Sequence, residues 1–576
     1  MKPTIIKILF VLSVVLLESC EDFLEFSPKG TLTEQQALSL ENAEKLVTAA
    51  YAAIGNDFWD RSITSMWVYG SVRSDDAYKG GGSVQDQFTI NRFEQYNLTT
   101  PDITDYLPLT WTQLYAVVSR ANFAITSLNA FTDAELPTRT TRIAEMRFLR
   151  GHAHFVGKLM WKLIPYIDET LTREQILETS NDALTNDELF NKIADDFQFA
   201  IDNLPEIQTE VGRANKFAAM AYLAKVRLYQ AYTQNEVHTV TGIDPARLNQ
   251  VVDLTTEVIN SGRYSLQPDF AENFLYGFDN GPESIFAIQY SIDDGTAIGR
   301  LSMSTSLNYS LAPQYGCCWF HMPSQNMINA FATTANGLPK FDTFNDVVLT
   351  DADLQTSGVT VDPRIDHTVA IVGHPFKYDP DIVYDHSWER ISALYGGFGN
   401  MKEQQAGDCP CFKKVGPFYG SSKNIDIIRY ADVLLMKAEA LIELNRQDEA
   451  LPLINEIRAR ANNSKERTRN ANGDYPSNFL IAEYEPGVNI TWDQPTARKA
   501  LQWERRLEFA MESPRFFDLV RWGIAAETLN AYLAKEKTRR SFLSSAVFTK
   551  GRDEYYPIPQ REINYTKGLY KQNPGY

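Results

Sequence analysis

Apolar residues recur every three or four positions over long stretches near both ends of this chain, and this helical spacing limits what it can fold into. In residues 143–163 the spaced positions are Met146, Leu149, Ala153, Val156 and Met160. Equivalent patterns occupy residues 33–55, 111–128, 186–204, 217–231, 246–261, 430–441, 450–461 and 497–522. Because an amphipathic helix has to bury its apolar face against a neighbour, the pattern predicts a mainly α fold of packed helical hairpins.

The middle of the chain, residues 264–424, has a different texture. Short strand-like pieces such as residues 284–288 alternate there with clusters of Gly, Pro and Asp. We therefore expect a long loop-rich insertion with short β-strands, set between helical scaffold segments at about 33–263 and 425–523. An irregular tail is predicted for residues 524–576.

The helical pair at residues 430–461 resembles a tetratricopeptide unit, with a tight turn at Asn445. The spaced residues of its two helices are Leu434, Ala438 and Leu441, then Ala450, Ile454 and Ile457. Small alanines let the two helices approach closely. With further hairpins near residues 120, 150 and 220, we expect a tetratricopeptide-like scaffold that forms a rigid curved wall.

Composition excludes some functions. The formal net charge is -18, with 73 acidic residues against 55 Lys and Arg, so a nucleic-acid partner is not expected. Hydrophobic residues make up 44% of the chain, enough to bury a real core. Aromatic residues make up 12%, which leaves flat rings beyond those that a core needs.

The N-terminus has the charge order of a secretory signal, because two lysines precede the apolar run at residues 8–17. That run is shorter than the ~20 residues that span a bilayer. The sequence LESC at 17–20 resembles a bacterial lipobox, although Glu18 stands where a small residue is usual. We interpret residues 1–19 as a lipoprotein signal peptide and Cys20 as the lipidated residue. An ordinary signal peptide cut nearby is the alternative.

Four further cysteines form two close pairs, Cys317 with Cys318 and Cys409 with Cys411. In an oxidising exterior they predict two disulfides that tie the loop near residue 318 to the loop near residue 410, with the pairing itself open. Four thiolates could instead hold zinc. Zinc ligands, however, are usually spaced two to four residues apart, so we prefer disulfides.

Several phrases, taken in order along the chain, resemble the SusD/RagB family of nutrient-binding outer-membrane lipoproteins of Bacteroidota. They are WTQLY (111–115) with RAN (120–122), EMRFLR (145–150), RYADVLL (429–435) with AEA (438–440), ERRLEF (504–509), RFFDLVRWG (515–523), and YPIP (556–559) with QNPGY (572–576). Glu21 and Asp22 also resemble the acidic signal that sends such lipoproteins to the cell surface.

The resemblance implies one SusD-like domain over residues 20–576, lipid-anchored at the outer face of the outer membrane. It implies a partner, a SusC-like TonB-dependent transporter, whose outer mouth the lipoprotein covers as a lid. The ligand would be an oligosaccharide or, in some members, a peptide. Capture and release require only a difference in affinity between open and closed states, so no enzyme activity is expected.

The charged residues of 504–521 have a structural interpretation. Glu504, Arg505, Arg506 and Glu508 are followed at spacings of three by Arg515, Asp518 and Arg521. Such sets form ion pairs that hold adjacent helices together. An acid/base role is the alternative, although catalytic carboxylates are usually not neutralised by arginines.

A glycan site needs aromatic platforms with polar groups at their edges, and two irregular segments contain that mixture. The first supplies Arg73, Asp75, Asp76, Tyr78 and Gln87, and the second supplies Tyr315 and Trp319, with Trp388 and Tyr395 as further candidates. In the family, ligand contacts come from loops at about these two places. Packing in the core is the alternative for each ring. Cofactors are not expected, but the neighbouring carboxylates Asp75 and Asp76 suit a structural calcium ion about as well as they suit catalysis.

Two rival functions fit the sequence less well. A secreted glycoside hydrolase would use two carboxylates, but the chain lacks the Gly-x-Ser-x-Gly, His-Glu-x-x-His and Walker motifs of other hydrolytic and nucleotide-binding enzymes. His152 and His154 alternate within a helix and so do not form a metal pair. A helical-repeat scaffold that binds only protein would leave the aromatic insertion without a role.

Overall fold

The computed structural model describes residues 38–56, 58–99, 104–297 and 299–576. The predicted signal peptide and Cys20 lie outside the described residues. The long helices are α3 (Leu40–Ile54), α6 (Tyr106–Asn129), α7 (Arg139–Trp161), α9 (Asn186–Asn203), α10 (Lys216–Ala231), α11 (Pro245–Asn260), α15 (Tyr430–Glu443), α16 (Gln447–Asn463), α17 (Gln494–Glu508) and α19 (Ala525–Arg539). The shorter ones are α4 (Trp67–Gly70), α5 (Phe88–Glu94), α8 (Arg173–Glu178), α12 (Gln325–Ala330), α13 (Ile365–Thr368), α14 (Ser392–Tyr395), α18 (Pro514–Arg521) and α20 (Gln560–Tyr565).

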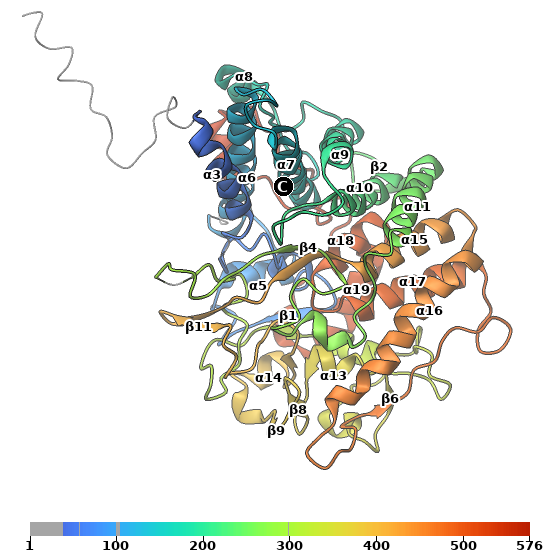
Figure 1. Cartoon of the computed structure of the whole chain (residues 1–576). Helices are drawn as coiled ribbons and strands as arrows, with labels where there is room; N and C mark the ends of the chain where they lie inside the picture. Colours follow the sequence, from blue (N-terminus) through green and yellow to red (C-terminus); the bar gives the residue numbers. More distant parts are fainter. Residues whose placement is uncertain (1–37, 57, 100–103, 298) are drawn as a thin grey trace, which may run out of the picture.

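The long helices pack on one another in chain order, and the insertion does not break the series. α3, α6, α7, α9, α10 and α11 each contact the next, and α11 then packs on α15, which packs on α16 and α17. Figure 1 shows them as an arc that runs from the blue α3 to the orange α16. The predicted mainly α fold with an interrupting insertion is confirmed, and each long helix matches a predicted apolar pattern except α19.

The strands of the described chain form only two-stranded sheets. The pairs are β1 (Ala77–Gly80) with β5 (Phe320–Pro323), β2 (Tyr232–Gln234) with β3 (Val240–Ile243), β4 (Ser284–Ile288) with β13 (Ile425–Arg429), β6 (Thr360–Val361) with β14 (Asn478–Phe479), β7 (Val369–Ala370) with β10 (Gly399–Asn400), β8 (Pro375–Phe376) with β9 (Asp379–Val383), and β11 (Phe412–Val415) with β12 (Phe418–Ser421). The antiparallel pair β4–β13 joins the two ends of the insertion, with Ile288 opposite Ile425.

Two details of the predicted outline were wrong. The tail is not irregular at first, because residues 525–539 form α19, which buries Leu529, Tyr532 and Leu533. The single helix expected over 497–522 is two helices, α17 and α18. The chain turns between them at Ser513, whose φ is 78°, and α18 restarts with Pro514 in its first turn, where a missing N–H is tolerated.

A buried network of ion pairs, which we call the arginine network, joins the insertion to the helices. Its members are Arg364, Arg429, Arg458 and Arg460 with Glu283, Asp362, Glu504 and Glu508, all at most 4% exposed. Arg364 Nη1 lies 2.6 Å from Glu504 Oε1, and Arg429 Nη1 lies 2.6 Å from Glu508 Oε1. The structural interpretation of the 504–521 charges is confirmed.

Two further sets extend this arrangement through the helical layer. Arg505 contacts Asp432 of α15 and Asp518 of α18, both at 2.9 Å. Arg521 pairs with Glu439 of α15 at 2.7 Å and with Asp518 at 3.0 Å. Each charge that the sequence motifs place in the interior is thus neutralised by a partner on another element, as buried charges require.

Replacing one carboxylate of the arginine network should be costly. In Glu508→Gln the buried Arg364, Arg429 and Arg460 lose a shared negative partner, and we expect unfolding free energy to fall by about 3 kcal/mol. The matched control is Glu466→Gln at the exposed pair with Arg469, expected to cost less than about 1 kcal/mol. Chemical denaturation of both variants measures the difference.

The pH dependence of stability should also differ between the parent protein and Glu508→Gln. Burial favours a high pKa for Glu508, but Arg460, Arg429 and Arg364 outweigh it and hold the pKa well below its usual range. A depressed folded-state pKa contributes stability above the unfolded value of about 4.3, and this is lost as pH falls below it. The melting temperature of the parent protein should therefore drop below about pH 4 more steeply than that of Glu508→Gln. Equal slopes would contradict the assignment.

Candidate functional site

The charged residues predicted for the first ligand loop are structural in this fold. The Arg73 guanidinium is fully buried, lies 4.3 Å from the centre of the Tyr556 ring and donates to the Asp553 carbonyl at 2.8 Å. Asp75 accepts from Arg515 at 2.8 Å, and Asp76 accepts from Arg506 at 3.2 Å. The prediction that these three residues contact ligand is wrong for this structure, because their side chains are enclosed and paired.

The same pairing bears on the calcium alternative. Burial favours a high pKa for Asp75, but Arg506 and Arg515 outweigh it and keep the pKa well below its usual range. Asp76 also pairs with Arg506, at 3.2 Å, but burial and the neighbouring Asp75 raise its pKa. Within the described residues, no group of three or more His, Cys, Asp or Glu side chains is arranged to hold a metal ion.

The aromatic residues predicted as platforms are also in the core. Trp319 is 1% exposed and stacks on Tyr384 with ring centres 6.1 Å apart. Tyr78 is 1% exposed, donates to Glu536 Oε2 at 2.5 Å and accepts from the Gln325 N–H at 3.0 Å. Burial likewise contradicts the platform role of Tyr315, Trp388 and Tyr395. Of the predicted ligand residues, Gln87 alone is half-exposed.

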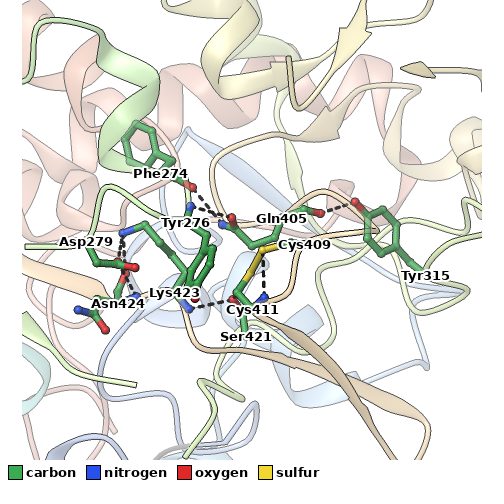
Figure 2. The surroundings of a disulfide bond; sticks show 10 residues. All are labelled: Phe274, Tyr276, Asp279, Tyr315, Gln405, Cys409, Cys411, Ser421, Lys423 and Asn424. Carbon is green, nitrogen blue, oxygen red and sulfur yellow. Dashed lines mark hydrogen bonds and ion pairs between the residues drawn. A yellow bond between two sulfur atoms is a disulfide. The ribbon is translucent and has the colours of Figure 1, made fainter. Parts of the chain in front are cut away.

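The cysteines form two local disulfides, Cys317–Cys318 and Cys409–Cys411. The expectation that they tie the two loops to each other is wrong, since each bond closes within its own loop. Figure 2 shows Cys409–Cys411 beside Gln405, which accepts from the Tyr276 N–H at 3.3 Å and donates to the Phe274 carbonyl at 3.0 Å. This disulfide thus lies at the base of the β11–β12 hairpin, next to the 274–276 segment.

Half-exposed rings gather where the loop after α3 meets this hairpin, and the sequence analysis did not single them out. We call Phe58, Trp59, Tyr106 and Phe418 the Trp59 patch; all but the buried Tyr106 are half-exposed. The Trp59 ring centre lies 6.0 Å from that of Tyr106 and 6.2 Å from that of Phe418, and Phe58 meets Phe418 edge-on at 5.9 Å. The clue in the sequence was the acid-flanked run of residues 57–60, DFWD.

Polar groups border the Trp59 patch. In the part of the chain that is described, Trp59 Nε1, Asp60 Oδ1 and Asp105 Oδ1 are buried atoms without a hydrogen-bond partner. Burial raises the pKa of Asp60, and Asp105 adds to the rise while Arg61 opposes it. Asp60 and Asp105 are half-exposed as residues, so their carboxylates border the rings at the surface. A hydroxyl-rich ligand needs such acceptors at the edge of an aromatic platform.

A cavity of about 180 Å³ between the helical layer and the insertion is the main competing site. Its charged lining is already paired: Lys225 with Asp432 at 3.1 Å, and Lys402 with Glu512 at 2.7 Å. Lys423 of the same lining lies 2.7 Å from Asp279 (Figure 2). We assign this cavity to the internal ion pairs of the fold.

Comparison with known proteins decides the family. Residues 282–576, just over half of the chain, match the model of the SusD family, and residues 22–228 match a family described as starch-binding and associating with the outer membrane. The chain belongs to the SusD family. Within its described part, no helix is both long and apolar enough to cross a membrane.

Individual relatives of this SusD-family protein align with it over nearly its whole length. SusD-like protein P38 of Formosa agariphila is 26% identical over 542 residues, covering 91% of this chain and 92% of the relative. A solved SusD homologue from Bacteroides thetaiotaomicron has a TM-score of 0.71 at 19% identity and covers 95% of this chain and 100% of its own. Surface glycan-binding protein A of the same organism, solved in complex with laminarihexaose, has a TM-score of 0.65 at 21% identity. The match covers 93% of this chain and 99% of that protein's chain.

Truncating a buried ring such as that of Trp319 should lower the stability of the whole fold, and any loss of binding should follow from that loss of stability. In Trp319→Ala we expect unfolding free energy to fall by about 3–5 kcal/mol, because the variant leaves a cavity against Tyr384. Thermal unfolding measures this. A well-folded Trp319→Ala protein with the melting temperature of the parent would contradict the core assignment.

Proposed function

We propose that the chain is a non-enzymatic glycan receptor that binds an oligosaccharide at the Trp59 patch. The observation that carries this is the coincidence of half-exposed rings with the half-exposed carboxylates of Asp60 and Asp105 at their edge. The solved relatives add support, since they include a laminarin-binding SusD-like protein and the laminarihexaose complex.

The chemistry of the Trp59 patch suits a sugar. The apolar C–H face of a pyranose ring packs on an aromatic ring, while its hydroxyls reach polar groups at the edge. The half-exposed Asp60 and Asp105 supply carboxylate acceptors. Capture of the sugar breaks no covalent bond. It requires only that the open and closed states of the receptor differ in their affinity for the sugar.

We further propose that Cys20 carries a lipid that holds the receptor at the outer face of the outer membrane. The match of residues 22–228 to a family associating with the outer membrane supports this. Two or more acyl chains, at about 0.8 kcal/mol per buried CH₂, give stable anchoring. The partner is a SusC-like TonB-dependent transporter, for which the receptor acts as a lid; support for that role comes from the family resemblance.

Removing the rings of the Trp59 patch should weaken glycan binding without unfolding the protein. We expect Trp59→Ala and Phe418→Ala each to lower affinity about 10-fold, equivalent to about 1.4 kcal/mol of lost packing. Isothermal titration with oligosaccharides chosen by a glycan array measures this. The control is Tyr565→Ala, which removes a ring that is 74% exposed elsewhere.

Two results would overturn this proposal. Unchanged affinity in both Trp59→Ala and Phe418→Ala would remove the site. Release of sugar from a polysaccharide by the purified protein, abolished in Asp60→Asn, would favour the glycoside hydrolase that two neighbouring carboxylates could form.

Loss of the anchor should release the receptor from the membrane. In Cys20→Ala we expect the protein to move from the outer-membrane fraction to the soluble fraction, because no acyl chain can be attached. Fractionation with detection of the protein measures this, and pull-down of the parent protein should recover a large barrel protein. Membrane retention of Cys20→Ala would contradict the lipid anchor.

A further inference from the structure

A surface groove runs along strand β4, and we call it the β4 groove. Its volume is about 510 Å³, within the range of about 300–1,000 Å³ that is typical of ligand sites. Four consecutive strand residues line it, Ser284, Ile285, Phe286 and Ala287, whereas no residue of β13 does. Because successive side chains of a strand point to opposite faces, a groove that meets all four follows the backbone edge of β4 away from β13.

This edge of β4 is open. Among the described residues, β4 pairs with β13 alone. The register with β13 leaves Ile285 without an opposite residue, and the Ala287 carbonyl accepts from the Gln289 side chain at 3.1 Å. An unpaired strand edge offers its backbone N–H and C=O groups to any extended chain that lies beside it.

Two apolar side chains stand in water at the rim of the β4 groove. Ile207 and Val211 line it and are 64% and 73% exposed. Both belong to the loop that joins α9 to α10. A strand that adds to a sheet edge gains affinity from main-chain hydrogen bonds and specificity from contacts of its side chains, and these two residues suit apolar side chains of such a strand.

The charge of the β4 groove is positive, although the chain as a whole carries -18. Its charged lining residues are Arg213, Arg263 and Glu210. Arg213 pairs with Glu210 and, at 2.8 Å, with Glu145. In the described part of the chain Arg263 forms no ion pair, and its guanidinium lies 5.8 Å from the centre of the Phe217 ring. An exposed arginine without a counter-charge favours an acidic partner.

The β4 groove continues into a second hollow of about 610 Å³. The two share Glu210 and Arg213, and α3 supplies Glu44, Lys45 and Thr48 to the second. A partner segment longer than β4 can therefore run on from the strand edge toward α3.

We infer that β4 accepts an extended segment of a partner protein as a third strand, and that this segment carries apolar and acidic side chains. The open edge pairs with its backbone, Ile207 and Val211 contact its apolar side chains, and Arg263 pairs with a carboxylate. None of these residues belongs to the Trp59 patch, so the inference does not depend on the proposed glycan site.

The test uses a defined peptide. The probe is a hexapeptide of alternating Val and Asp with blocked ends, titrated into the parent protein, and we expect saturable binding with a dissociation constant below about 1 mM. Because the N–H groups of a strand point alternately to its two edges, N-methylation of every second residue should weaken binding at least about 10-fold in one of the two registers. The same peptide with Lys in place of Asp should also bind at least about 10-fold more weakly.

Variants of exposed residues locate the probe on the protein. Arg263→Glu should lower peptide affinity about 10-fold and Val211→Ser about 3-fold, whereas the control Val488→Ser, at a residue that is 78% exposed outside the groove, should leave it unchanged. Hydrogen exchange of the backbone amides of β4 should slow when the peptide is bound. Melting temperatures report folding of each variant.

Three results would overturn the inference: no saturable binding of the Val–Asp peptide, equal affinity for both N-methylated peptides and the parent peptide, or unchanged affinity in both Arg263→Glu and Val211→Ser. The oligosaccharide selected for the Trp59 patch should bind Arg263→Glu as tightly as it binds the parent protein. A loss of glycan affinity in a folded Arg263→Glu protein would assign the β4 groove to the glycan instead of a protein partner.

Discussion

The fold depends on the arginine network, because it is the point at which the loop-rich insertion is attached to the helices. Its four guanidinium groups and four carboxylates are all but excluded from water. A buried charge is tolerated only when its partner of opposite charge lies beside it. The network therefore fixes the position of the insertion relative to α17 as well as adding stability. Glu504 and Glu508 lie on α17, whereas Glu283, Asp362 and Arg364 belong to the insertion, and this division links the two parts.

That attachment explains why the site can be assembled from distant segments. Trp59 follows α3, Tyr106 opens α6 and Phe418 lies on β12, more than 300 residues further along. The helices hold the first two, and β12 holds the third through its pairing with β11 and its bridge from Ser421 to Ser302. Loops placed on a rigid base in this way can present side chains to a ligand without large changes in shape.

The sequence predicted the helices well because their signal is local: the spacing of Met146, Leu149 and Ala153 needs no tertiary information. The charges of 504–521 were predicted to form ion pairs, but distant partners such as Arg364 and Asp432 were not, because no local pattern connects them. The tail showed that a short pattern is easily missed, since Leu529, Tyr532 and Leu533 carry the helical spacing of α19.

The ligand residues were harder, because an aromatic ring beside acidic residues has the same sequence signal in a core as on a surface. Trp319 and Trp59 differ only in what other segments cover them, Tyr384 closing over one and solvent meeting the other. Asp75 likewise gave no local sign that Arg506 and Arg515, over 400 residues away, would enclose it. The predicted loops were nevertheless neighbours, joined through Arg390.

The β4–β13 pair brings Ile288 against Ile425, so the long excursion between them leaves and returns at one place. Closing a loop costs little more as it lengthens, since the entropy grows only with the logarithm of its length. Loops within the excursion can therefore change length at little cost, provided that Arg364 keeps its ion pairs with Glu504 and Glu508 of α17. Proteins built on one scaffold can therefore alter the loops of this segment, including the one that carries Phe418, without rebuilding the helices.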